Sequence, residues 1–205
     1  MTHMARSRAG HSILEDQQED SWPPWCQDLL KDSSYEHIGK TTRTHGGPRG
    51  PSFNILIGKT LFTNHTIRAM KLLYKAPSST KPMAGSSDQH QEGKTTSGEL
   101  TALISLGDEM CSHTNVLHGG INTTIIDEVG GALAAREVPV DMMAVNFNVN
   151  LRKSVKTPGI ILVRAWMEKP PQGRKIWVHC RTEQDGQTCI ESESLYLEVD
   201  MGSKL

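Results

Sequence analysis

The feature that most constrains the fold is a long helix-patterned segment, residues 119–136, with strand-patterned segments before and after it. Strand patterns, alternating or continuously apolar, cover residues 100–106, 144–152, 159–168, 175–182 and 187–199. Asp185-Gly186 predicts a tight turn between the last two of them. Because the linkers are too short for parallel crossovers, we expect an antiparallel sheet whose last four strands form a meander. The pattern therefore predicts an α+β fold in which a curved sheet wraps one long central helix.

The predicted helix has two different faces. At 100° per residue its larger apolar side chains fall within one arc, which we expect to face the core: Ile121, Ile125, Ile126, Val129, Ala132 and Leu133. Asp127 falls opposite this arc, among the small residues Thr123, Thr124, Gly130, Gly131 and Ala134. A glycine inside a helix costs about 1 kcal/mol relative to alanine, so two of them indicate a close approach at this face. We predict that a partner subunit packs there and makes Asp127 part of a shared cleft.

A His118-Gly119-Gly120 segment stands at the start of the predicted helix. The first amides of a helix have no partner within it and carry the positive end of the helix dipole. Glycines at this point let a carbonyl oxygen approach those amides, which is the geometry of an oxyanion hole. Asp127 follows the second glycine by seven residues and adds a carboxylate to this candidate site.

The motif and the strand order together resemble the hotdog-fold thioesterases of the PaaI and 4-hydroxybenzoyl-CoA type. The matching motif runs over residues 116–131 (VLHGGINTTIIDEVGG), and the following strand, residues 145–153 (VNFNVNLRK), also matches. Gly173-Arg174-Lys175 and Asp185-Gly186-Gln187 match the later hairpins. The resemblance extends over roughly residues 53–200 and implies the hotdog fold.

The resemblance also implies an activity and an assembly. It implies hydrolysis of an acyl thioester, with Asp127 as the general base or nucleophile. It implies the Gly119 or Gly120 amide as the oxyanion donor, with His118 as a positioning group beside it. It further implies homodimers or dimers of dimers, with active sites at the subunit interface.

Three positions depart from the pattern of these thioesterases. Ser112 stands where Asn is frequent, and Ala144 stands where Ser or Thr is frequent. In the resembling enzymes both positions help to hold the attacking water or the carboxylate. Ser112 can replace part of that role, whereas Ala144 has no side-chain hydrogen bond to offer. Asn115 stands where Gly is frequent, and Asn tolerates left-handed backbone better than most residues.

The implied substrate is an acyl-CoA or an acyl-pantetheine thioester. CoA carries phosphates, and the candidate partners for them are Arg152, Lys153, Arg174 and Lys175. Ser112, Asn115 and Thr123 complete the predicted substrate-binding set. We expect neither a cofactor nor a metal ion.

Charge balance, apolar runs, cysteine spacing and the last three residues limit the kinds of partner and the cellular location that we expect. Lys and Arg number 22 against 23 Asp and Glu, which does not favour nucleic-acid binding. No apolar run approaches the roughly 20 residues that span a bilayer, and residues 1–10 are not followed by the apolar segment of a secretory signal. The four cysteines have no CxxC spacing, so we expect reduced thiols in an intracellular protein. Ser203-Lys204-Leu205 matches the peroxisomal address, which predicts a peroxisomal location and an import receptor as partner.

We expect three parts along the chain. Residues 1–52 form a polar, partly disordered extension, and residues 53–200 form one hotdog thioesterase domain. Within that domain, residues 78–97 are rich in Ser, Thr and Gly and predict a mobile insertion. Residues 201–205 form the targeting tail. The extension includes a short helix that begins at residues 21–24 and carries its apolar residues on one side: Trp25, Leu29 and Leu30.

Two functions from different classes stay open. The first is an acyl-CoA thioesterase that releases a free acid and CoA, in lipid metabolism or in secondary metabolism. The second is a non-catalytic acyl-thioester-binding or regulatory protein on the same scaffold, which the departures at Ser112 and Ala144 favour. A hydratase ranks last because its Asp and His loop motif is not found in the sequence. The acyl chain, the choice between CoA and a carrier-protein pantetheine, and the choice between dimer and tetramer stay open as well.

Overall fold

A computed structural model of the chain describes residues 22–38, 46–47, 50–51, 56–77 and 97–200. The described helices are α2 (Pro24–Lys31), the π-helical turn η1 (Leu56–Thr60) and α3 (Gly119–Glu137). The described strands are β1 (Glu36–Ile38), β2 (Gly46–Gly47), β3 (Gly50–Pro51), β4 (Ile67–Lys75), β5 (Glu99–Leu106), β6 (Cys111–His113), β7 (Val116–Leu117), β8 (Met142–Leu151), β9 (Gly159–Trp166), β10 (Lys175–Gln184) and β11 (Gln187–Glu198). The predicted insertion, apart from Ser97, and the predicted tail at residues 201–205 lie outside the described residues.

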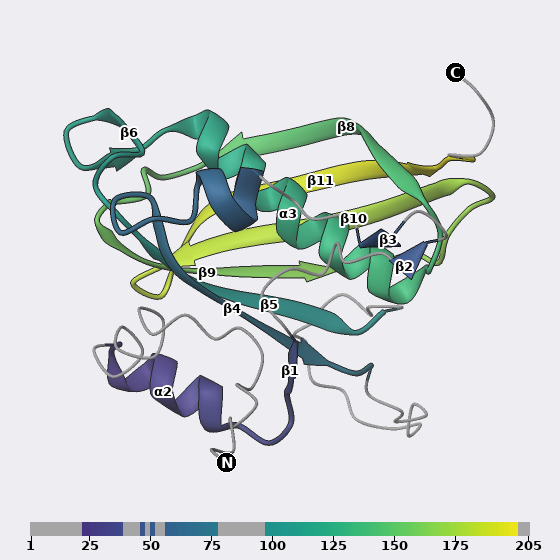
Figure 1. Cartoon of the computed structure of the whole chain (residues 1–205), viewed down its shortest axis with the longest axis horizontal. Helices are drawn as coiled ribbons and strands as arrows, with labels where there is room; N and C mark the ends of the chain where they lie inside the picture. The colour runs from purple at the N-terminus through teal and green to yellow at the C-terminus, as the bar shows by residue number, and fades with distance from the viewer. Residues whose placement is uncertain (1–21, 39–45, 48–49, 52–55, 78–96, 201–205) are drawn as a thin grey trace, which may run out of the picture.

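Seven strands form one antiparallel sheet in the order β1-β4-β5-β9-β10-β11-β8 (Figure 1). Strands β9, β10 and β11 make a meander, and the turn at Asp185-Gly186 has the two positive φ angles, 52° and 71°, of a type I′ hairpin. The prediction that β8 belongs to this meander is wrong, because β8 pairs with β11 at the edge of the sheet. The segment after β8 must cross three strand spacings, about 14 Å, to enter β9. Residues 152–158 are long enough for that crossing.

Helix α3 lies across one face of this sheet, in front of β8, β11, β10 and β9 (Figure 1). The arc that was predicted to face the core is buried from Ile125 onward, and Ile121 at its start is partly buried. These side chains pack among inward-facing residues of the strands, such as Ile161, Ile176 and Ile190. Each fully buried aliphatic side chain contributes roughly 1.5–3 kcal/mol. The central helix wrapped by an antiparallel sheet is the predicted hotdog fold.

The small face of α3 is mostly covered by the chain's own sheet. Gly130, Gly131 and Ala134 are buried, and only Thr123, Thr124 and Asp127 of that face stay half-buried. A Cβ atom on Gly130 would lie 2.9 Å from the Tyr196 hydroxyl and 3.2 Å from the Cys180 sulfur. The prediction that a partner subunit makes the close approach is wrong for Gly130, because side chains of β10 and β11 make it.

Helix α2 packs on the opposite face of the sheet. Trp22 and Cys26 are buried against a patch formed by β4, β5 and β9. Leu29 and Leu30 pack against the same patch, as the sequence predicted, but Trp25 is 45 % exposed. Cys26 and Leu30, four residues apart within α2, lie on the buried side of the helix, and Trp25 is turned about 100° from Cys26. Strand β1, from the N-terminal segment, pairs with β4 and so extends the sheet.

Strand β8 is an edge strand with a β-bulge. Its register against β11 shifts by one residue at Val145, which has no partner residue in the pairing. Val145 and Leu151 are apolar positions of the alternating pattern in residues 144–152, which on its own assigns them to the core face, but they are 52 % and 61 % exposed. The bulge turns Val145 outward, and Leu151 lies at the end of the strand, while Phe147 and Val149 between them are partly buried. An exposed apolar edge of this length is typical of a strand that pairs with another chain.

Candidate active site

His118 is the N-cap residue of α3. Its backbone is extended (φ −61°, ψ 132°), and its Nδ1 accepts a hydrogen bond of 2.9 Å from the Gly120 amide. A ring nitrogen that accepts carries no proton, so the imidazole holds its proton on Nε2. The side chain is exposed, so this Nε2–H is a donor for a bound molecule.

The two glycine amides that were predicted as oxyanion donors differ. The Gly120 amide is already bonded to His118, whereas the Gly119 amide has no acceptor within the part of the chain that the structure describes. Gly119 is the first residue of α3, and its N–H is one of the amides that a helix leaves without an internal partner. A Cβ atom on Gly119 would meet only the Leu151 side chain, at an ordinary 3.5 Å. Gly119 is therefore the better placed of the two donors.

Asp127 is half-buried where α3 passes over β10 and β11. The Tyr196 hydroxyl donates a hydrogen bond of 3.1 Å to the Asp127 carbonyl and lies 3.4 Å from its Oδ1. Tyr196 is fully buried, and its ring makes an edge contact with Phe147 at 6.3 Å between centroids. Burial raises the pKa of the neighbouring Cys180 thiol to about 12, and the charge of Asp127 acts in the same direction. Asp127 is thus a carboxylate fixed to the sheet beside a thiol that keeps its proton.

The carboxylate and the free amide are well separated within one chain. Asp127 follows Gly119 by eight residues on the same helix. At 1.5 Å per residue this is about 12 Å along the helix axis. A base or nucleophile and an oxyanion donor must each lie about 3 Å from the atoms of one carbonyl group. One chain therefore cannot bring its own Asp127 and its own Gly119 to the same thioester.

The other predicted binding residues surround the start of α3. Ser112 is exposed on β6, in a hairpin that leads into the helix. Asn115 in the same hairpin has φ 59°, the left-handed conformation for which Asn is suited, and its carbonyl accepts from the Thr157 amide at 3.1 Å. The Thr123 hydroxyl donates to the Gly119 carbonyl at 3.2 Å, so it is engaged by its own helix.

The four predicted phosphate partners lie in two pairs at opposite ends of the sheet: Arg152 with Lys153, and Arg174 with Lys175. Measured along β11, the two ends are about 23 Å apart. Arg152 Nε lies 2.5 Å from a Glu191 carboxylate oxygen, and Lys153 Nζ lies 2.8 Å from the Gln187 side-chain oxygen. Arg174 donates twice to the Glu198 carbonyl, at 3.0 and 2.8 Å. The first pair follows Leu151, which adjoins Gly119, so only this pair lies near the start of α3.

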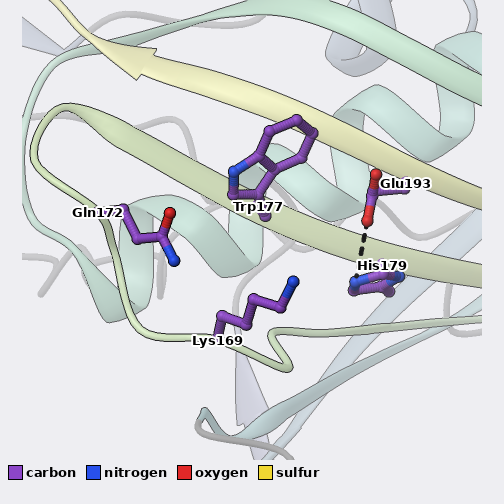
Figure 2. A pocket seen from close by; sticks show the side chains of 5 residues that line it. All are labelled: Lys169, Gln172, Trp177, His179 and Glu193. Atoms are coloured by element: carbon purple, nitrogen blue, oxygen red, sulfur yellow. Dashed lines mark ion pairs between the residues drawn. The ribbon is translucent and has the colours of Figure 1, made fainter.

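A separate hollow of about 280 Å³ lies on the outer face of the sheet (Figure 2). Trp177 and His179 of β10 and Glu193 of β11 form one side, and Lys169 and Gln172 of the β9–β10 connection form the other. His179 Nε2 lies 3.5 Å from a Glu193 carboxylate oxygen. Alternate residues of β10 face α3, so this hollow and the candidate site lie on opposite faces of the sheet. None of the site residues predicted from the sequence lines it.

Sequence reasoning did not single out Tyr196 and Cys180, the two side chains closest to Gly130. Two signals pointed toward them. A glycine within a helix indicates a close neighbour, and a tyrosine at an inward-facing strand position needs a partner for its hydroxyl. Joining these signals requires knowing that β11 crosses the middle of α3, which local patterns do not contain. No three His, Cys, Asp or Glu residues gather as metal ligands within the described ranges.

A comparison with protein families finds that the model of the thioesterase superfamily matches residues 114–186. The matched residues include His118, Gly119 and Asp127. This segment belongs to the thioesterase superfamily. No curated protein matches the chain by sequence. Within the described residues, no helix is long and apolar enough to cross a membrane.

Several solved structures are similar to the chain over about half its length. A phenylacetic acid degradation-related protein from Ralstonia eutropha is 18 % identical, with 48 % of this chain and 75 % of that chain covered and a TM-score of 0.45. An acyl-CoA hydrolase from Staphylococcus aureus, solved with butyryl coenzyme A and coenzyme A, is 16 % identical (52 % and 66 % covered, TM-score 0.47). A thioesterase protein from Streptococcus pneumoniae, solved with coenzyme A, is 12 % identical (49 % and 81 % covered, TM-score 0.46). These identities are too low to transfer residue roles.

Proposed function

We propose that the protein is an acyl-CoA thioesterase that hydrolyses an acyl thioester to a free acid and CoA. The observation that carries the proposal is the pair formed by the half-buried Asp127 carboxylate and the free Gly119 amide, both in the segment that matches the thioesterase superfamily. A carboxylate and an unbonded helix-start amide are the two groups that thioester hydrolysis requires, one for the attack and one for the oxyanion.

The reaction follows from these groups. Asp127 takes a proton from a water molecule as the water oxygen adds to the thioester carbon, or its carboxylate adds there directly. The Gly119 amide, at the positive end of the α3 dipole, stabilises the oxyanion that forms, and the His118 Nε2–H is the second donor beside it. The carbon–sulfur bond then breaks. In the general-base route the proton held by Asp127 passes to the thiolate, so CoA leaves as a thiol. In the nucleophilic route the thiolate leaves from a mixed anhydride on Asp127, and water then hydrolyses the anhydride, which releases the acid, regenerates the carboxylate and provides the proton for the thiolate.

The separation of about 12 Å between the two groups supports a site shared by two chains. In such a site, Asp127 of one chain acts on the thioester whose oxygen is bound by Gly119 of the second chain. A homodimer is the smallest assembly that forms it, and two-fold symmetry produces two equal sites. The edge strand β8 is the surface we assign to the pairing, because Met143 and Val145 are more than half exposed on it. A dimer of dimers contains the same site.

Arg152 and Lys153 are our candidates for the CoA phosphates, since they follow β8 at the end where α3 begins. Arg152 already pairs with Glu191, so a phosphate must compete with or join that ion pair. The acyl chain and the choice between CoA and a carrier-protein pantetheine stay predictions, as does a role in lipid or secondary metabolism. We also propose a peroxisomal location, on the basis of Ser203-Lys204-Leu205, which lies outside the described residues.

The test uses two variants that each remove one chemical group. Asp127→Asn keeps the side-chain size and removes the charge. Gly119→Pro removes the amide proton at the first position of a helix, where proline is well tolerated, and His118 already has the extended backbone that a residue before proline adopts. With a panel of acyl-CoA substrates and a thiol reagent to detect CoA, we expect each variant to lose about 10²-fold or more in kcat.

Gly119→Ala is the matched control, because it retains the amide and adds a methyl group that meets only Leu151 at an ordinary distance. Its turnover should stay within a few-fold of the original chain. If Asp127→Asn hydrolyses the substrates at the original rate, Asp127 has no catalytic role. The alternative of a non-catalytic acyl-thioester-binding protein is favoured by Ala144, which offers no side-chain hydrogen bond. That alternative predicts CoA binding by calorimetry together with no turnover of any substrate in the panel.

A further inference from the structure

The Tyr196 side chain links Asp127 to the sheet by hydrogen bonding. Tyr196 stands near the C-terminal end of β11 and is 1 % exposed, so its hydroxyl is shielded from water. Its oxygen lies 3.1 Å from the Asp127 carbonyl and 3.4 Å from Oδ1. The carbonyl contact ties the hydroxyl to the helix backbone, and the Oδ1 contact ties the carboxylate to the hydroxyl. One donor thus spans the backbone and the side chain of the same residue.

Gly130 makes the space for this contact. An added Cβ would lie 2.9 Å from the Tyr196 hydroxyl oxygen, closer than real Cβ contacts allow. Any larger residue at position 130 must therefore push the hydroxyl away from Asp127. A helix-interior glycine is unfavourable by itself, so its position directly over this hydroxyl is the feature that most needs an explanation.

The neighbouring strand offers no competing hydroxyl. Ala144 of β8 is the direct cross-strand partner of Tyr196, and its side chain has no polar atom. Residues directly opposite in an antiparallel pair point to the same face of the sheet, at about 5 Å between Cα atoms. A side chain at position 144 therefore lies on the same face of the sheet as the Tyr196 ring.

We propose that Tyr196 is a positioning residue for Asp127, and that Gly130 is a glycine in order to admit its hydroxyl. The proposal rests on the proposed function, because it assigns how the reactive carboxylate is oriented. The Tyr196 hydroxyl contacts Oδ1 and so fixes the orientation of the carboxylate toward the water or the thioester carbon. Tyr196 acts through Asp127 and does not contact the substrate.

The test compares the removal of two tyrosine hydroxyls, on β11 and on β4, that both donate to residues of α3. Tyr196→Phe retains the ring and removes the contact with Asp127. Tyr74→Phe is the matched control, since the Tyr74 hydroxyl donates a hydrogen bond of 2.6 Å to the Glu137 carboxylate at the far end of α3. We expect Tyr196→Phe to lower kcat about ten-fold with little change in KM, and Tyr74→Phe to leave both constants as they are.

The outcomes separate this proposal from the proposed function. If Asp127→Asn is inactive but Tyr196→Phe retains the full kcat, Tyr196 does not position the carboxylate and only this inference fails. If Asp127→Asn is fully active, the proposed function fails first. Gly130→Ala provides an independent measurement should Tyr196→Phe not fold, because it retains the tyrosine and displaces its hydroxyl. A Gly130→Ala protein with unchanged kcat would overturn the proposal.

Discussion

The substitution Gly130→Ala tests the packing of α3 against the sheet, and two opposing effects determine its result. Alanine is the better helix former by about 1 kcal/mol. The added Cβ would lie 2.9 Å from the Tyr196 oxygen and 3.2 Å from the Cys180 sulfur, and both atoms are buried. Overpacking of this kind costs about 1–3 kcal/mol, and a weakened hydrogen bond to Asp127 costs about 1 kcal/mol more. The expected net effect is a loss of about 1–3 kcal/mol in the free energy of unfolding.

A double-mutant cycle with Tyr196→Phe measures how much of the Gly130→Ala effect depends on the Tyr196 hydroxyl. In the variant that lacks the hydroxyl, the oxygen at 2.9 Å is gone, and the closest remaining neighbour is the Cys180 sulfur. Gly130→Ala should then be neutral or stabilising by up to about 1 kcal/mol, because the helix-forming advantage of alanine is no longer opposed. Urea unfolding followed by circular dichroism measures the four proteins. The coupling between the two positions is the difference between the two effects of Gly130→Ala, about 1–4 kcal/mol.

Two results would refute this reasoning. One is a Gly130→Ala protein that is as stable as the original chain or more stable. The other is an equal effect of Gly130→Ala in the original chain and in the Tyr196→Phe variant, which would mean that the hydroxyl does not occupy the space above the glycine. Either result would remove the structural basis for the tyrosine contact with Asp127.

Three further predictions address other parts of the molecule. Because burial raises the pKa of Cys180 from 9.0 to about 12, the folded state retains a proton that the unfolded chain loses, so stability falls as pH rises through this window. The free energy of unfolding, measured in urea at pH 8, 9 and 10, should therefore fall less steeply with pH for Cys180→Ser than for the original chain, by roughly 1 kcal/mol per pH unit above pH 9. Equal slopes for the two proteins would contradict the raised pKa of Cys180. Val145→Asp places a charge on the exposed β8 edge and should convert a dimer into a monomer in light scattering, whereas an unchanged mass would exclude this edge as the interface. Removal of Ser203–Leu205 should leave a fluorescently tagged chain in the cytosol with its activity intact in vitro, and continued peroxisomal localisation of the shortened chain would disprove the targeting role.

Much of the local structure could be predicted from the sequence because its signals are local. The helix that begins at Gly119 has a glycine-rich start and a 3.6-residue apolar repeat, and α3 spans Gly119–Glu137. Asp185-Gly186 predicted a hairpin because both residues accept positive φ, and both have it. Asn115 likewise has the left-handed conformation that its residue type favours.

The order of the strands could not be predicted in the same way. The alternation of β8 identifies a strand but does not say which neighbour it pairs with, and β8 lies beside β11 rather than β9. The bulge at Val145 also has no local signal, because it depends on how β8 and β11 are aligned. A count of two residues per repeat then assigns Val145 to the wrong face.

For the small face of α3, the sequence predicted which residues share the face but not what packs against them. Counting 100° per residue correctly separated Asp127 and Gly130 from the apolar arc. It did not reveal that the sheet also covers much of this second face, since that depends on the width of the sheet and on Tyr196 in β11. The glycine was a valid signal of close packing, but its neighbour is a side chain of the same chain.

The most direct test of the central claim is subunit complementation between Asp127→Asn and Gly119→Pro. Each variant alone should be almost inactive toward acyl-CoA, because every site in its dimer lacks one of the two groups. If the site is shared, half of the dimers in an equimolar, re-associated mixture are mixed, and one of the two sites in each mixed dimer contains an intact Asp127 and an intact Gly119. The mixture should then recover about a quarter of the original activity. A mixture that exchanges subunits but stays inactive would contradict a shared thioesterase site built from these two residues.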